Sequence, residues 1–274
     1  DLLDEVKFEL DWLKTMQDTD GGVFFKLTTL GFSGMVMPAA DKAARYVIGK
    51  TTASALDFAA MMAMAGRIYK DYDSIYAADC IIRAENAWVW AKENPAIYFK
   101  NPSDVSTGEY GDSNVSDEFI WAAAELYITT QKAEFKTYLE GKSSSLKYSG
   151  APGWPSVQPL ASLSLATQPN GLSSSLLTAI KNSITSTSDN WLTQINANAA
   201  RIPQFGFNWG SNSGIANMGV GLLYAYILTK DAKYIKGAAE CADYLLGKNA
   251  TGFSFVTGFG KKTPMNIHHR PSSA

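Results

Sequence analysis

The only two histidines of the chain, His268 and His269, are adjacent to each other and to Arg270, in a segment rich in Gly and Pro. His268 and Arg270 are two residues apart, so in extended backbone their side chains would point to the same side and could reach one ligand. A zinc site would need further His or Cys ligands, and the sequence has none to spare. The segment is therefore either a binding loop for a polar ligand or a basic surface turn.

A second polar segment, residues 107–121, is a turn-rich loop that leads into a helical pattern. It carries four carboxylates, those of Glu109, Asp112, Asp117 and Glu118. Oxygen donors on a loop and the first helical turn suit a hard cation such as calcium. The same acids would also stabilise the positive end of a helix dipole, with Ser116 as the capping residue. The composition leaves both interpretations open.

A third segment, residues 205–213, places Trp209 among glycines and asparagines, before another helical pattern. A flat indole can stack on the apolar face of a sugar ring, while nearby amides bind the ring hydroxyls. A neutral polysaccharide would fit such a loop. The alternative is that Trp209 is a packing residue, since most Trp side chains are largely buried.

Charge and hydropathy exclude some partners. The chain has 24 basic and 26 acidic residues, so it lacks the basic surface that nucleic-acid binding requires. No stretch approaches the roughly eighteen apolar residues of a membrane span, and residues 1–5 do not resemble a signal peptide. We therefore expect neither a nucleic-acid nor a membrane partner. Cys80 and Cys241 lie in Ala-rich helical patterns and are expected to be buried free thiols.

Helical periodicity dominates the chain and predicts an all-α fold of one domain, residues 1–274. The predicted helices cover residues 6–16, 54–69, 75–92, 117–130, 160–166, 175–199, 214–228 and 232–246. Only 22–29 and 253–257 alternate like strands. Successive helices without alternating strands indicate a solenoid or a closed ring of helix pairs. The long connections 31–50, 101–116, 142–156 and 202–213 are expected to be functional loops.

The polar segments resemble those of glycoside hydrolase family 9, the inverting cellulases built on an (α/α)6 barrel. The similarity to the family's histidine signature is carried by Ser254, Val256, Thr257, Gly260, Lys262, Ile267, His268 and Arg270. Residues 110–112 and 117–126 resemble its calcium and cleft loop, and 209–212 resembles its loop with a stacking Trp. Residues 2–5, 12–13 and 45–52 look like the bacterial branch of the family. The similarity extends over essentially the whole chain.

This resemblance implies an endo-1,4-β-glucanase, a cellulase with a glycosidase toroid fold, from a secreted bacterial protein whose signal peptide lies outside this chain. The partner would be β-1,4-glucan, as cellulose or cello-oligosaccharides. His268 belongs to the active-site signature, and the implied substrate-binding residues are His268, Arg270, Trp209, Tyr110 and Asp112. The implied ligands of a structural calcium ion are Ser113, Asn114, Asp117 and Glu118. No organic cofactor is expected.

Two family motifs do not occur in the sequence: the Asp-Ala-Gly-Asp motif that holds the attacking water, and the later signature with the general-acid Glu. Inversion needs a base and an acid on opposite faces of the sugar, roughly 6.5–9.5 Å apart. We therefore expect a barrel incomplete at its N- and C-terminal ends and a fragment without activity of its own. Its exposed edges would favour self-association. The alternative is a non-catalytic β-glucan-binding barrel.

Overall fold

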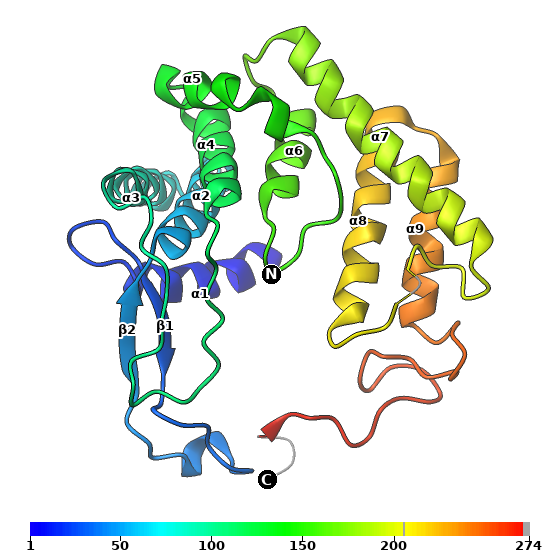
Figure 1. Ribbon diagram of the computed structural model, residues 1–274, viewed down its shortest axis with the longest axis horizontal. Helices are drawn as coiled ribbons and strands as arrows, with labels where there is room; N and C mark the ends of the chain where they lie inside the picture. The colour runs from blue at the N-terminus through cyan, green and yellow to red at the C-terminus, as the bar shows by residue number, and fades with distance from the viewer. Residues whose placement is uncertain (205, 271–274) are drawn as a thin grey trace. The chain divides into compact units, whose positions relative to one another are not determined.

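The computed structural model describes residues 1–204 and 206–270 (Figure 1). Over these residues the chain forms nine α-helices, two short 3-10 helices and one two-stranded sheet. Its contacts divide it into two compact units. Unit 1 comprises Asp1–Lys142 together with Arg270, and unit 2 comprises Ser143–His269.

Unit 1 is built around one apolar helix. It contains α1 (Leu2–Thr15), α2 (Thr52–Tyr69), α3 (Ser74–Glu93), α4 (Ser116–Thr130), α5 (Ala133–Gly141) and the 3-10 helix Pro38–Ala40. Helix α2 packs against both α3 and α4. Its small Ala side chains, including the fully buried Ala59 and its neighbour Ala60, allow neighbours on more than one face. Small residues on several faces are typical of a helix that packs on both sides.

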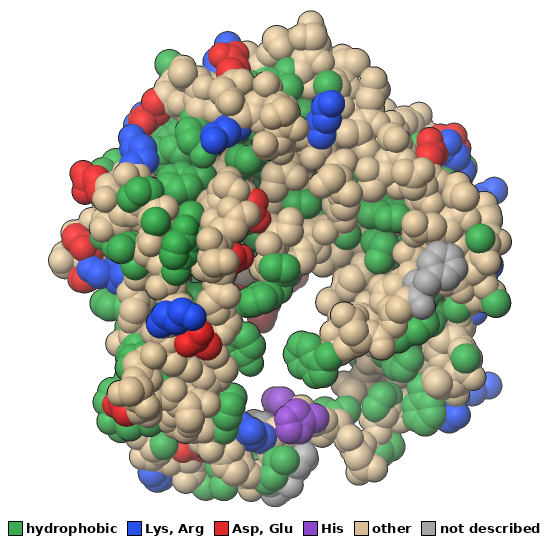
Figure 2. Space-filling view, in the orientation of Figure 1, with side chains coloured by type: hydrophobic (Ala, Val, Ile, Leu, Met, Phe, Trp, Pro, Cys, Tyr) green, Lys and Arg blue, Asp and Glu red, His purple; other side chains and the backbone are tan. Residues whose placement is uncertain are grey.

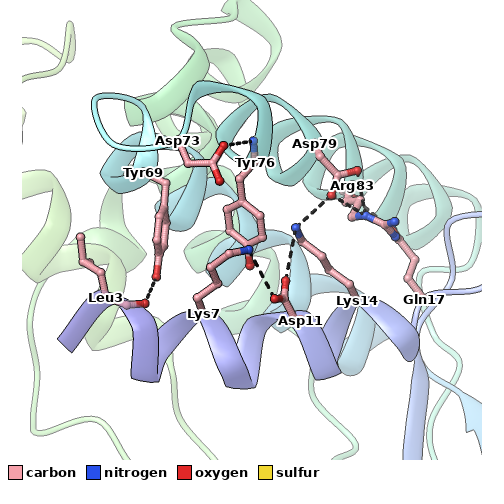
Figure 3. A network of polar contacts seen from close by, with 10 residues as sticks. All are labelled: Leu3, Lys7, Asp11, Lys14, Gln17, Tyr69, Asp73, Tyr76, Asp79 and Arg83. Carbon is pink, nitrogen blue, oxygen red and sulfur yellow. Dashed lines mark hydrogen bonds and ion pairs between the residues drawn. The ribbon is translucent and has the colours of Figure 1, made fainter. Parts of the chain in front are cut away.

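Polar contacts attach α1 to α3 (Figure 3). The ring of Tyr76 lies between two ammonium groups, with the Nζ of Lys7 at 3.4 Å and that of Lys14 at 3.3 Å from its centroid. Asp79 accepts from Lys14 at 2.9 Å and from Arg83 at 3.0 Å. The polar side of α1 thereby faces its neighbour.

The rest of α1 leaves apolar side chains exposed. Leu2, Phe8 and Trp12 are 76%, 80% and 46% exposed. Beside them, a groove of about 420 Å³ runs between α1 and α2, with Leu10 and Met64 among its lining residues. An exposed apolar surface of this kind is typical of an interaction site.

The sheet of unit 1 is an antiparallel hairpin of β1 (Phe24–Thr28) and β2 (Tyr46–Lys50). Lys26 pairs with Ile48 in its register. Strand β1 confirms the predicted strand 22–29, but β2 lies in the segment 31–50 that was expected to be a loop. Phe25 on β1 stacks on Phe99, with the ring centroids 4.0 Å apart.

Unit 2 is helical. It contains α6 (Gln158–Thr167), α7 (Ser174–Ala197), α8 (Ser211–Thr229), α9 (Ala232–Leu245) and the 3-10 helix Ser143–Leu146. Helices α7, α8 and α9 pack on one another and appear side by side in Figure 1. Helix α8 approaches α7 closely at Gly221, where an added Cβ would lie 2.5 Å from the ring of Trp191. A side chain at this position would therefore force the two helices apart.

The structure also tests the predictions for the cysteines, for strand 253–257 and for membrane spans. Cys80 in unit 1 and Cys241 in unit 2 are both buried and free, as predicted. The predicted strand 253–257 is wrong, because the segment forms turns and the Phe255 amide bonds to the Leu245 carbonyl at 2.8 Å. No helix within the described ranges is long and apolar enough to cross a membrane. Acidic and basic side chains are interspersed on the face drawn in Figure 2.

Candidate functional site

The loop before α8 exposes an aromatic platform in unit 2. Trp209 is 99% exposed, which excludes the packing role considered for it. Gly210 follows in the left-handed region, with φ at 77°, and forms the N-cap of α8. Phe207 from the same loop stacks on Tyr244 of α9, with centroids 6.3 Å apart. The loop is thus attached to α9 through one ring while the indole next to it stays available to a ligand.

The histidine segment of unit 2 is folded by its own backbone. Ser254 is 3% exposed, and its amide donates to the carbonyl of Lys262 at 2.8 Å. Gly260 has φ at 86°, and an added Cβ would lie 3.1 Å from that of Ser254. His268 follows this turn and is exposed. It belongs to unit 2 and Arg270 to unit 1, so their binding of one common ligand stays a prediction.

A pocket over the hairpin brings two predicted substrate-binding residues together in unit 1. It encloses about 460 Å³, within the range of small-ligand sites. Tyr110, 65% exposed, and Arg270 both line it. The guanidinium of Arg270 lies 4.8 Å over the ring of Phe32. Arg45 also lines this pocket, so aromatic rings and cationic donors face the same space.

The loop before α4 folds differently from the capped start that was considered. Val115 is the N-cap, without a side-chain cap bond, and Ser116 is already the first helical residue. The side-chain oxygen of Asn114 accepts from the Ser116 amide at 3.2 Å and from its hydroxyl at 2.7 Å. Asp112 in turn accepts from the Asn114 amide at 2.8 Å. The capping role considered for Ser116 as one of two interpretations is therefore wrong, because Val115 is the N-cap and Asn114 forms the turn that starts the helix.

The first turn of α4 holds an acidic pair, the half-buried Asp117 and the buried Glu118. Glu118 is 4% exposed, and its Oε2 has no hydrogen-bond partner among the described residues. Burial, followed by the hydrogen bond with Asp117, raises the pKa of Glu118 to about 9. A hard cation would replace the shared proton, so the pair fits a calcium ion. Ser113 and Asn114, the other two expected ligands, are exposed.

Donors beyond this pair are scarce. Within the part of the chain that the structure describes, no group of three or more acidic, His or Cys side chains has the arrangement of a metal site. Calcium at Asp117 and Glu118 therefore stays a prediction, with oxygen ligands beyond the carboxylates needed to complete it.

Asp57 was missed by the sequence interpretation. It lies on α2, and its buried Oδ1 has no hydrogen-bond partner among the described residues. Burial, with the charges of Asp117 and Asp112, raises the pKa of Asp57 to about 7. It lines a pocket of about 240 Å³ whose walls include Trp12 and Phe24. The available signal was a single carboxylate in an otherwise apolar helical pattern.

The comparisons with known proteins decide the family. The model of glycosyl hydrolase family 9 matches residues 1–274. The chain belongs to this family. A xyloglucan-specific endo-β-1,4-glucanase of Bacteroides ovatus is 38% identical over 293 residues, which cover 100% of this chain and 50% of that protein. The family 9 chain thus spans about half the length of this curated relative.

Solved family 9 structures confirm the fold class. A Bacteroides ovatus structure of the family superposes with a TM-score of 0.92 at 36% identity, covering 100% of this chain and 53% of that one. The structure of AaCel9A in complex with cellobiose-like isofagomine superposes at 0.90 with 30% identity, covering 96% and 51%. The family 9 chain is thus all-α and a partial (α/α) barrel.

Proposed function

We propose that this family 9 chain is part of an endo-1,4-β-glucanase that hydrolyses β-1,4-glucan by an inverting acid and base mechanism. The observation that carries the proposal is the 38% identity, over the whole chain, to a protein named as an endo-β-1,4-glucanase. The name of the AaCel9A complex, with its cellobiose-like ligand, supports a cello-oligosaccharide as the bound form. In this proposal the substrate is a neutral β-glucan, which agrees with the net charge of −2.

The chain's own residues would bind and orient the glucan. In unit 2, Trp209 would stack on a sugar ring of the glucan. In unit 1, Tyr110 and Arg270 would contact glucan in the pocket over the hairpin. Arg270 offers a rigid fork of donors to hydroxyl oxygens, and His268 can donate or accept. Asp112 would accept from a sugar hydroxyl.

Bond cleavage would need carboxylates that these residues do not supply. The Asp-Ala-Gly-Asp motif does not occur in the 274 residues. The two carboxyl groups with strongly raised pKa values, those of Asp57 and Glu118, each have one oxygen buried inside unit 1, Oδ1 and Oε2 respectively. General acid or base groups each contribute about 10²- to 10⁴-fold to a rate. We therefore propose that the chain by itself binds glucan without cutting it.

The second candidate is a non-catalytic β-glucan-binding protein, which the fully exposed Trp209 also favours. The purified chain is titrated with cellopentaose by calorimetry, and reducing sugar is measured after incubation with carboxymethylcellulose. We expect binding without turnover above a blank. Absence of binding would contradict the proposed substrate, and turnover would contradict the inactivity of the chain. The same assay on the full-length protein separates the two candidates, since only a glucanase releases sugar.

Three further features belong to the proposal. Calcium would bind at Asp117 and Glu118 and stabilise the start of α4. The protein would be secreted, as a glucanase acting on an external polymer must be. The exposed apolar side of α1 would support self-association.

A further inference from the structure

The ammonium group of Lys26 on β1 donates three hydrogen bonds inside unit 1. Its Nζ donates to Asn101 Oδ1 at 2.9 Å, to Thr107 Oγ1 at 3.0 Å and to the Gly108 carbonyl at 2.9 Å. A lysine ammonium has three protons, so each has an acceptor. All three acceptors lie between residues 101 and 108, which have no regular secondary structure. Lys26 therefore ties an irregular segment to a strand.

The tied segment, residues 99–111, has other attachments at its two sides. Phe99 stacks on Phe25 of β1 at 4.0 Å. The Ser106 amide donates to the carbonyl of Leu30 at 2.7 Å. Asn101 lies between these two attachments, and the other two acceptors of Lys26, Thr107 and Gly108, follow Ser106 and lead to the exposed Tyr110.

Gly108 connects Lys26 to Tyr110. A Cβ added to Gly108 would lie 2.3 Å from the ring of Tyr110, so the ring rests directly on this glycine. Tyr110 itself has φ at 52°, in the left-handed region that a residue with a side chain rarely adopts. Such a conformation persists only where the surrounding structure holds it. The Gly108 carbonyl that accepts from Lys26 is part of that surrounding structure.

We propose that Lys26 is a positioning residue: it holds segment 99–111 so that Tyr110 faces the hairpin pocket and can receive a sugar ring of a β-1,4-linked glucan. This inference rests on the proposed function, which makes Tyr110 a residue that contacts the glucan. Lys26 also lines the hairpin pocket, but its three protons already have acceptors in segment 99–111, so its role is to hold that segment and, through it, Tyr110.

The first test asks whether Lys26 holds the segment, and it needs no ligand. Lys26→Met keeps most of the side chain and removes the three donors. The matched control is Lys50→Met on β2, which removes bonds of 2.8 and 2.7 Å to Asp18 and Asp20, outside the segment. Hydrogen exchange at the hydrogen-bonded amides of Asn101 and Ser106 should accelerate roughly tenfold in Lys26→Met and stay unchanged in Lys50→Met. Unchanged exchange in Lys26→Met overturns the inference.

The second test asks whether the effect passes through Tyr110. Affinity for cellopentaose is measured for Lys26→Met, Tyr110→Ala and the double variant. We expect a roughly tenfold loss in each single variant and no further loss in the double variant. Independent, additive losses would overturn the inference. If Lys26→Met does not fold, Thr107→Val enters both tests in its place. It removes one acceptor of Lys26 and also the 2.9 Å contact with the Thr28 hydroxyl, so Thr28→Val is its control and should show the smaller effect.

The experiments distinguish a failure of the proposed function from a failure of the positioning role of Lys26. If the parent chain does not bind cellopentaose, the proposed function fails, while the exchange measurement still decides whether Lys26 holds segment 99–111. If the parent binds and the two losses add, the proposed function stands and the positioning role fails.

Discussion

The guanidinium of Arg67 on α2 donates through Nη2 to the carboxylate of Glu125 on α4, at 2.8 Å. Glu125 is fully buried, whereas the side chain of Arg67 is 23% exposed. Its Nη1 also donates to Thr129 Oγ1 at 2.7 Å. The buried charge of α4 therefore depends on a cation supplied by α2.

Arg67→Met should destabilise unit 1 by about 3–5 kcal/mol, since it leaves a buried carboxylate without its cation. Unfolding in urea measures the change. The control is Lys92→Met, which breaks an exposed ion pair with Glu134 and should cost less than about 1 kcal/mol. A double variant, Arg67→Met with Glu125→Gln, should recover part of the loss. Equal costs for the Arg67 and Lys92 variants would contradict this prediction.

The stability of unit 1 should fall as the pH rises towards 7. The folded pKa of Asp57, about 7, lies above its ordinary value of 3.8, so the folded state keeps a proton that the unfolded state releases. The stabilisation is complete below pH 4 and is lost as the pH rises through 7, by on the order of 2–4 kcal/mol. The loss is measured by urea unfolding of the parent and of Asp57→Asn over this pH range, with a chelator present to remove calcium. Identical pH slopes for the two proteins would contradict the assignment to Asp57.

Calcium should raise the melting temperature by several degrees at pH 7.5. The ion would replace the proton held by the Asp117 and Glu118 pair and neutralise both carboxylates. Calorimetry with millimolar calcium or with chelator measures the shift. Glu118→Gln should abolish it, while Glu109→Gln, outside the pair, should leave it intact. A calcium effect that survives in Glu118→Gln would place the ion elsewhere.

Trp209→Ala should weaken cellopentaose binding by about 1–3 kcal/mol, by analogy with aromatic stacking on other flat ligands. Because the indole is 99% exposed, the melting temperature should not change. Trp154→Ala is the matched control, since that indole is also largely exposed, at 68%, in another loop of unit 2. If both variants lose the same affinity, stacking is not specific to the loop before α8.

His268→Ala should lower cellopentaose affinity severalfold at constant melting temperature. The imidazole is exposed, so its loss leaves no cavity. His269→Ala is the neighbouring control and should retain affinity. Affinity within twofold of the parent in His268→Ala would make the histidine a surface residue and remove it from the site.

Helices were the most predictable part of the fold. The patterns around 54–69 and 75–92 match α2 and α3 to within two residues, because apolar residues repeat at helical spacing and Asp73 caps α3. Helix α5 was missed because its only buried residues, Phe135 and Leu139, give one helical interval and no longer period. Strand β2 was missed because it follows a segment rich in Gly and Pro, and its pairing with β1 is a tertiary contact.

The candidate site was predictable as a set of residues and not as an arrangement. Loop composition singled out Trp209 and Arg270, since polar and aromatic residues between helices have little use in a core. Tyr110 was singled out by the resemblance to the family. The common pocket of Tyr110 and Arg270 depends on chain segments that are far apart in sequence. The roles of Asp57 and Lys26 depend on which atoms lie beside them, which local periodicity does not encode.

Each unit also contains one buried free cysteine. Cys80 on α3 is 0% exposed and Cys241 on α9 is 1% exposed, and neither forms a disulfide. Burial raises the pKa of both thiols, so neither can react with an alkylating reagent until the helices around it open. The labelling rate of Cys80 therefore reports the opening of unit 1, and that of Cys241 reports the opening of unit 2. Both rates can be measured in a single labelling experiment on the unaltered chain.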